Sequence, residues 1–225
     1  MAFMYDIFPN LQRAQEELIE CLFQTLDMVV VSGLISFLFG VIFGVILIVT
    51  RKGGILENKI IYNVLDKLIN IIRSIPFLIL MVLLIPLSRT IVGTGSGVMG
   101  AYIPLIAGTI PFFSRQIETA IAEVDGGLIE AAQAMGCTPW QIITRVYLKE
   151  SIPSIARVTM ITAINLIGLT AMAGAIGAGG LGDFAIRYGY QLNLNDLMWL
   201  TIFIILILIS LVQLIGNLII KKTTH

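Results

Sequence analysis

Residues 28–49 read MVVVSGLISFLFGVIFGVILIV and contain no charged side chain. The run stops at Thr50-Arg51-Lys52-Gly53-Gly54, a charged stretch with two glycines. A helix needs about 20 consecutive apolar residues to cross the hydrocarbon core of a bilayer. This stretch therefore predicts a transmembrane helix, and it sets the fold class for the chain around it.

Four further apolar runs follow, at residues 68–87, 98–117, 153–173 and 197–220. The run at 68–87 is interrupted by Arg73 and Pro76. Hydrophobic residues make up 57% of the 225 residues and charged residues 12%, against about 25% charged in soluble domains. Backbone polar groups in lipid must be satisfied within the segment, which favours helices. We predict an all-α integral membrane protein with five spans in one domain, residues 1–225.

The positive charges are unevenly distributed among the loops that these five spans leave. One side would hold only Arg13, Arg89 and Arg187. The other side would hold the remaining eleven of the fourteen: Arg51, Lys52, Lys59, Lys67, Arg73, Arg115, Arg145, Lys149, Arg157, Lys221 and Lys222. Basic residues accumulate on the cytosolic side of membrane proteins. The N-terminus is then expected outside the cell membrane and the C-terminus in the cytosol.

The segment before the first run admits two interpretations. Leu11, Ala14, Leu18 and Leu22 recur at helical spacing, which is typical of an amphipathic helix lying on the outer membrane surface. Alternatively, the segment extends the first span outward. Asp6, Glu16, Glu17, Glu20 and Asp27 make it acidic, as expected for an external segment. It lacks the basic start and the cleavage site of a signal peptide.

The predicted loop at residues 118–152 is too long for a simple connection. Asp125 can cap a first short helix, and Gly136 can end it in the left-handed conformation that glycine adopts freely. Thr138-Pro139-Trp140-Gln141 is a capping box with proline at the first helical position, so a second helix is expected from Pro139 to about Lys149.

The first loop helix has a face of small residues, Ala131, Ala132 and Ala134. Such a helix could dock into a groove on another protein. It could equally pack against the spans of its own chain.

The run Glu130-Ala131-Ala132-Gln133-Ala134-Met135-Gly136 resembles the EAA motif of permease subunits of ATP-driven importers. Lys149 departs from the proline that the motif has in its later part, and Pro153 follows four residues on. The resemblance implies the permease architecture of type I ABC importers. It also implies that the loop is a coupling helix in which Glu130, Ala131, Ala132 and Gly136 contact an ATPase subunit.

Three other stretches resemble the methionine importer permeases in particular. They are Ile72-Arg73-Ser74-Ile75-Pro76-Phe77, Ile91-Val92-Gly93-Thr94 and the glycine-rich residues 171–182. The resemblance implies a homodimer with two cytosolic ATPase subunits, an extracellular substrate-binding lipoprotein, and D- or L-methionine or a close analogue as substrate. Another small amino acid is the alternative substrate.

Two sequence motifs are relevant to nucleotide binding, one present and one absent. Residues 177–182 match GxGxxG, but they follow a predicted membrane helix instead of a strand, so dinucleotide binding is not expected. The chain has no GxxxxGK[ST] motif, so ATP should be bound by a separate partner. We expect no cofactor, metal or nucleic acid on this chain. An intramembrane enzyme is disfavoured because His225 is the only histidine.

Polar residues within the spans are candidates for the translocation path. Thr162, Asn165, Leu169 and Met172 are spaced to share one face of the fourth span. That face could line a path for an amino acid, or Asn165 could simply hold spans together. Arg73 could reach the cytosol or pair with Asp66. A secondary transporter is less well supported, because five spans do not divide into an inverted repeat.

Overall fold

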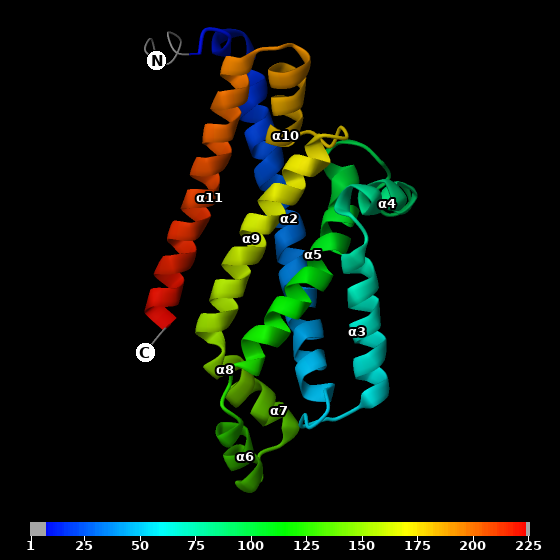
Figure 1. Cartoon of the computed structure of the whole chain (residues 1–225), viewed down its shortest axis with the longest axis vertical. Helices are drawn as coiled ribbons and strands as arrows, with labels where there is room; N and C mark the ends of the chain where they lie inside the picture. The colour runs from blue at the N-terminus through cyan, green and yellow to red at the C-terminus, as the bar shows by residue number, and fades with distance from the viewer. Residues whose placement is uncertain (1–7, 224–225) are drawn as a thin grey trace. The chain divides into compact units, whose positions relative to one another are not determined.

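The computed structural model describes residues 8–223, so Asp6 and His225 lie outside the described residues. Every regular element in this range is helical, as predicted (Figure 1). The elements are α2 (Leu11–Thr50), α3 (Lys59–Ser74), α4 (Phe77–Val92), α5 (Gly97–Ala122), α6 (Gly126–Ala134), α7 (Pro139–Ile142), the π-helix η1 (Ile143–Tyr147), α8 (Leu148–Glu150), α9 (Ile152–Gly174), α10 (Gly180–Phe184), the π-helix η2 (Ala185–Gln191) and α11 (Asn195–Thr223).

Four of the helices are long and apolar enough to cross a membrane: α2, α5, α9 and α11. They contain the predicted spans 28–49, 98–117, 153–173 and 197–220. The pair α3 and α4 passes the same criterion together, with a bend at the break between them. Five crossings result if this pair is one broken span. The chain is therefore a multi-pass membrane protein.

The prediction of one kinked span at 68–87 is wrong in its bounds. The helical segment starts at Lys59 and ends at Val92, and it is broken at Ile75 and Pro76, which both have extended backbone ψ angles. Proline has no N–H to donate and disfavours helical geometry in the residue before it. Pro76 therefore ends one helix and leads into the next, instead of only bending it.

The N-terminal segment extends the first span, so the surface-lying amphipathic helix is wrong. Helix α2 runs without interruption through 40 residues. Leu11, Ala14, Leu18 and Cys21 are buried in a core cluster with Leu181, Phe184 and Leu197. The apolar stripe therefore packs on protein. The helical spacing is as predicted, but the stripe faces protein instead of the lipid surface.

The chain divides into two compact units. Unit 1 is built from the part before Ile35, Pro76–Ala107 and Ala163–Val212, and unit 2 from Ile35–Ile75, Gly108–Thr162 and the part after Val212. Unit 1 contains the cluster just described and a second core around Met28, Met81 and Leu105.

Unit 2 has one core cluster, in which α2 and α5 pack closely through glycines. A Cβ atom added to Gly40 would lie 2.4 Å from Cδ1 of Phe113, and one added to Gly44 would lie 2.5 Å from Cγ2 of Ile117. Real Cβ atoms do not approach so near, so only glycine fits at these crossings. The stripe Ser36, Gly40 and Gly44 therefore packs within the subunit, as small-residue stripes in membrane helices commonly do.

Candidate functional site

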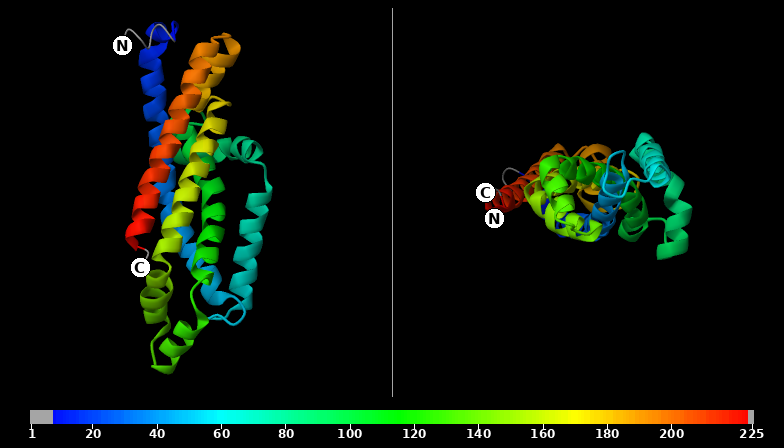
Figure 2. Two further views of the ribbon diagram at one scale, coloured as in Figure 1. Left: turned by 60° about the vertical axis from the view of Figure 1, so that its left-hand side comes forward. Right: turned by 90° about the horizontal axis from the view of Figure 1, so that it is seen from below.

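The segment from α6 to α8, residues 126–150, folds into a helical hairpin in unit 2 beyond the ends of α5 and α9 (Figure 1, Figure 2). We refer to it as the hairpin. Asp125 caps α6, because its Oδ1 accepts a hydrogen bond of 2.8 Å from the backbone N–H of Gly127. The prediction of a helix start at this aspartate is confirmed.

The end of α6 is closed by a Schellman motif. Gly136 has φ +76°. Its N–H donates to the carbonyl of Gln133 at 2.9 Å, and the N–H of Cys137 donates to the carbonyl of Ala132 at 3.1 Å. These two bonds satisfy carbonyls that the helix end leaves without partners. The predicted left-handed glycine is therefore present, and it sets the direction in which the chain enters α7.

The second arm of the hairpin starts with the predicted capping box. Thr138 Oγ1 accepts from the N–H of Gln141, and Gln141 Oε1 accepts from the N–H of Thr138 at 2.8 Å. Pro139 occupies the first turn. The helical path continues through η1 and α8 to Glu150, so the helix expected from Pro139 to about Lys149 is confirmed, with a π-helical segment in its middle.

Buried side chains fix the hairpin to the rest of unit 2. Ala132, Ile142 and Tyr147 lie in one core cluster with Ile121 and Val158. Burial raises the pKa of the Tyr147 hydroxyl. The hairpin is therefore a rigid extension of the helices beneath it.

A hydrogen bond links the two helices that flank the hairpin. The Ser154 hydroxyl of α9 donates to Glu123, just after α5, at 2.5 Å. A displacement of the hairpin should consequently move α5 and α9 with it.

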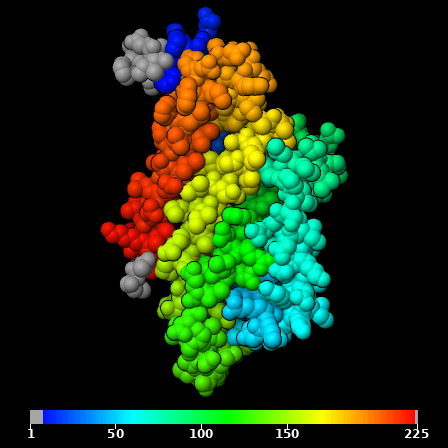
Figure 3. Space-filling view, in the orientation of Figure 1, coloured from blue at the N-terminus to red at the C-terminus, as the bar shows by residue number. Residues whose placement is uncertain are grey.

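The outer face of the hairpin exposes large apolar side chains. Met135 is 76% exposed, Trp140 72% and Leu128 47%. Glu130 and Ala131 are also exposed on this face, which lies at a free end of unit 2 (Figure 3). Exposed apolar residues grouped on one surface are typical of protein–protein contacts, and tryptophan is among the residues that most often dominate such contacts.

Ala132 differs from its neighbours in the predicted contact set. Its side chain is 3% exposed and packs in the core of unit 2. Residues Glu130, Ala131 and Gly136 are exposed. Because α6 turns by about 100° per residue, adjacent alanines necessarily face different directions. The predicted small-residue docking face is therefore divided, and the methyl of Ala132 faces its own chain.

Helix α9 carries the three candidate path residues, but it does not place them all on one exposed face. Thr162 is buried at 6% exposure, and its hydroxyl donates to the carbonyl of Val158 at 2.8 Å. Asn165 and Met172 are exposed, together with Gly168 between them. The predicted common face therefore includes Asn165 and Met172 but excludes Thr162.

Asn165 is the polar group on this face. Among the described residues, its side-chain amide has no hydrogen-bond partner in the structure. An amide in the middle of a span cannot remain unsatisfied against lipid without a large penalty. The face of α9 that bears Asn165 is therefore suited to water or to another protein surface.

A charged network joins α3 to α5 in unit 2. The Arg115 guanidinium lies 2.5 Å from Asp66 and 2.6 Å from Glu118. Asp66 is thus paired with Arg115, so the suggested pair between Asp66 and Arg73 is wrong. Arg73 is exposed in the last turn of α3, where the helix dipole favours a positive charge.

The glycine-rich loop at 177–182 is a close-packing element in unit 1. The N–H of Gly180 donates to Gln24 Oε1 at 2.7 Å, and the N–H of Leu181 donates to Thr25 Oγ1 at 2.8 Å. Gly180 has φ +79°, and a Cβ there would lie 2.7 Å from Thr25 Oγ1. The loop follows helix α9, and no strand occurs in residues 8–223. The GxGxxG match therefore reflects close packing on α2.

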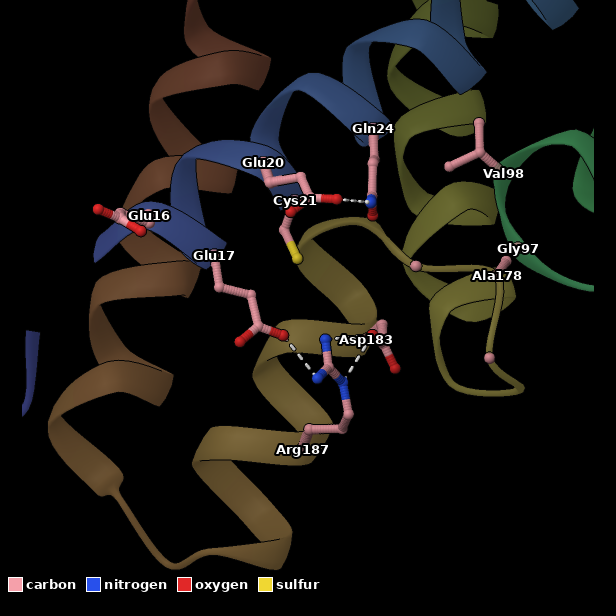
Figure 4. A pocket seen from close by; sticks show the side chains of 12 residues that line it. Glu16, Glu17, Glu20, Cys21, Gln24, Gly97, Val98, Ala178, Asp183 and Arg187 are labelled. Carbon is pink, nitrogen blue, oxygen red and sulfur yellow. Dashed lines mark hydrogen bonds and ion pairs between the residues drawn. The ribbon is translucent and has the colours of Figure 1, made fainter. Parts of the chain in front are cut away.

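The sequence analysis does not predict the short helices α10 and η2 or the ion pairs that their charged residues form. Arg187 lies 2.6 Å from Glu17 and 2.7 Å from Asp183, beside a cleft of about 440 Å³ in unit 1 (Figure 4). The hydroxyl of Tyr188 donates to Glu17, which raises the pKa of Tyr188. The available signal was the spacing of Asp183 and Arg187 by four residues, which places them on one helix face.

Comparison with known proteins agrees with this architecture. Residues 36–225 match the family model described as "Binding-protein-dependent transport system inner membrane component". The "Probable D-methionine transport system permease protein MetI" of Vibrio cholerae is 45% identical over 208 residues, 92% of each chain. Its counterpart of the same name in Pasteurella multocida is 42% identical over 202 residues, which is 90% of this chain and 93% of that one.

A solved structure described as inward-facing conformations of the MetNI methionine ABC transporter is also similar. Its matching chain has a TM-score of 0.92 and 42% identity, over 95% of this chain and 99% of that one. The family model covers well over half of the sequence, and the relatives are similar over nearly their full length. The chain therefore belongs to the family of inner membrane components of binding-protein-dependent transport systems.

Proposed function

We propose that the chain is the permease subunit of an ATP-driven importer of methionine. The observation that carries the proposal is the rigid hairpin with its exposed face of Leu128, Met135 and Trp140. A water-exposed apolar face of this kind suits a partner protein. Similar chains are named as D-methionine permeases and as part of a methionine ABC transporter. These names indicate methionine as the substrate and ATP as the energy source.

The partners follow from the same family. Two copies of this chain form the membrane-spanning part, two copies of an ATPase subunit bind to the hairpins, and an extracellular substrate-binding lipoprotein delivers methionine. ATP is bound by the ATPase, and this chain is not the enzyme and needs no cofactor. The exposed hairpin residues Glu130 and Ala131 support this assignment, since they are free to meet a partner.

Within the hairpin, the proposed residues have different tasks. Glu130 and Ala131 contact the ATPase, together with Leu128, Met135 and Trp140. Gly136 holds the turn, and Ala132 transmits force by packing into the core of unit 2. When the ATPase dimer closes on ATP, the hairpins move together, and the buried anchors carry the motion into α5 and α9.

A co-purification experiment tests the hairpin assignment. A tagged chain co-expressed with its ATPase subunit should retain the ATPase through membrane extraction. Trp140→Ser should lower the retained ATPase, whereas Trp199→Ser, which changes another exposed tryptophan, on α11, should not. Equal retention by both variants would contradict the assignment.

For substrate passage, we propose that Asn165 and Met172 line the path, and that the buried Thr162 supports the helix behind them. The exposed amide of Asn165 and the exposed Met172 side chain suit a small zwitterion with an apolar thioether. Methionine uptake measured in competition with other small amino acids tests the substrate. Strong competition by an unrelated amino acid at equal concentration would favour the alternative substrate.

The proposed orientation has the N-terminus outside and the C-terminus in the cytosol of a bacterial cell. It is supported by the eleven-to-three distribution of basic residues. Cys137 in the hairpin is partly exposed, whereas Cys21 is buried. In a Cys21→Ser variant, an impermeant thiol reagent should label Cys137 in inside-out vesicles and not in intact cells. Labelling of Cys137 in intact cells would show that the orientation is the opposite of the proposed one.

A further inference from the structure

An apolar groove of about 360 Å³ lies in unit 2 between the second half of α2 and the first half of α3. Its lining includes Phe43 and Ile46 of α2 and Ile60, Ile61, Val64 and Leu68 of α3. All four of these α3 side chains are exposed, and Ile60 is 76% exposed. Within a membrane, such a groove is filled either by lipid or by another apolar helix.

The length of the groove along α3 is close to the thickness of one membrane leaflet. Its α3 residues extend from Ile60 to Leu68, and eight residues at a rise of about 1.5 Å span about 12 Å along the helix. Half of a hydrocarbon core of about 30 Å is about 15 Å. One end of the groove lies next to Lys59, the first residue of α3, so the groove runs inward from the membrane surface.

Positive charge surrounds the surface end of this groove. Arg51 and Lys52 directly follow α2, and Lys59 begins α3; both lysines are exposed. Glu57 is the only carboxylate in residues 51–59, and it accepts a hydrogen bond of 2.9 Å from the backbone N–H of Gly53. The N-terminal end of α3 adds a partial positive charge at the same place. The mouth of the groove therefore attracts an anion at the membrane surface.

Charge also disfavours a second copy of this chain as the occupant. Helix α11 is the long apolar helix with the least buried surface, and it ends in Lys221 and Lys222. Two copies in the same orientation would bring these lysines to the membrane surface from which the groove starts. Arg51, Lys52, Lys59, Lys221 and Lys222 would then meet with Glu57 as the one carboxylate of residues 51–59, and the repulsion between like charges costs free energy.

We propose that this groove binds one acyl chain of an anionic phospholipid, with its phosphate held between Arg51, Lys52 and Lys59. The apolar walls accept the chain and the cationic mouth selects the headgroup. This site goes beyond the transport function and does not depend on it, since lipid binding needs neither ATPase nor methionine.

Native mass spectrometry of the purified full chain tests the headgroup selection. The probes are phosphatidylglycerol and phosphatidylcholine added at equal concentration. The parent should retain phosphatidylglycerol preferentially. The double variant Lys52→Gln/Lys59→Gln should lower this preference about tenfold or more, because each surface lysine contributes on the order of 1 kcal/mol to anionic lipid binding. The matched control Lys221→Gln/Lys222→Gln removes the same charge elsewhere and should keep the preference.

Photo-crosslinking tests the occupant itself. A benzophenone amino acid at Val64 in the full chain, irradiated in native membranes, should yield an adduct with the mass of a phospholipid. An adduct with a second copy of the chain would overturn the proposal, and so would equal phosphatidylglycerol preference in the two double variants. Methionine uptake is not part of either readout, so failure of the lipid site and failure of the transport function are distinguishable.

Discussion

Gly136→Ala perturbs the turn of the hairpin through its backbone alone. The residue has φ +76°, and a Cβ built there meets no atom within 4 Å. No collision contributes, so the cost is the left-handed conformation itself, about 1–2 kcal/mol for an L-residue. That energy shifts the balance between the native turn and relaxed turns by about 5- to 30-fold. The angle at which α7 leaves α6 changes in the relaxed turns, and the ATPase contact weakens with it.

Two variants separate this effect from the mere addition of a side chain. Gly126→Ala adds the same methyl at the start of α6, where φ is not positive and nothing lies within 4 Å. It should bind like the parent, because alanine is favoured over glycine in helices. Gly136→Asn should keep most of the ATPase binding, because asparagine enters the left-handed region more readily than alanine does.

The assay is the dissociation constant for the ATPase subunit, measured on each variant after extraction from membranes. Gly136→Ala should raise it, by at most about 30-fold because only the population of relaxed turns lowers the affinity, with unchanged amounts of protein in the membrane. If Gly136→Ala binds the ATPase as tightly as Gly126→Ala, the turn does not position the contact and the reasoning is refuted. Loss of Gly136→Ala from the membrane would show instead that the turn serves only folding.

Three further substitutions probe other parts of the structure. Ala131→Asp should weaken ATPase binding without lowering the thermal unfolding midpoint. Ala132→Asp buries a charge and should lower the yield of folded protein. Equal behaviour of the two variants would contradict the division of the α6 face into an exposed and a buried side. Gly44→Ala places a Cβ 2.5 Å from a methyl carbon of α5 and should destabilise the protein by about 1–3 kcal/mol, while Gly33→Ala, with its nearest atom at 3.5 Å, should leave the unfolding midpoint unchanged. Asn165→Leu should preserve folding and reduce methionine uptake, and uptake equal to the parent would exclude this face from the path.

The hairpin was predictable because its signals are local. Asp125 caps a helix that begins at the next residue, and Thr138 caps one by bonding to a residue three positions later. Gly136 ends α6 through bonds within four residues of itself. Each of these arrangements depends only on neighbours in the sequence, so the residue types and their spacing specify it.

The direction of Ala132 and the length of α2 depend on distant residues. Ala132 packs beside Tyr147 and Val158, and the N-terminal part of α2 packs on Phe184 and Leu197. Helical spacing reveals that an apolar face exists, but it does not reveal what covers it. A membrane surface and a protein core are equally consistent with such a stripe, so the spacing alone does not separate a helix on the outer surface from an outward extension of the first span.

The break in the second span and the helices after α9 could not be predicted from the sequence for a different reason. Arg73 and Pro76 were recognised as interruptions, but a proline inside a span can either kink the helix or end it. Likewise, the glycines before Leu181 disfavour a helix. Their positive φ angles allow close packing on α2, yet a short helix starts immediately at Gly180.

Methionine uptake into proteoliposomes tests the central claim most directly. The vesicles contain the purified chain and its ATPase, with the binding protein loaded with methionine on one side and ATP supplied on the side of the hairpin. Uptake should require ATP, the ATPase and the binding protein together, and the chain alone should neither bind nor hydrolyse ATP. Methionine accumulation by the chain alone, driven by an ion gradient without ATPase, would contradict the account.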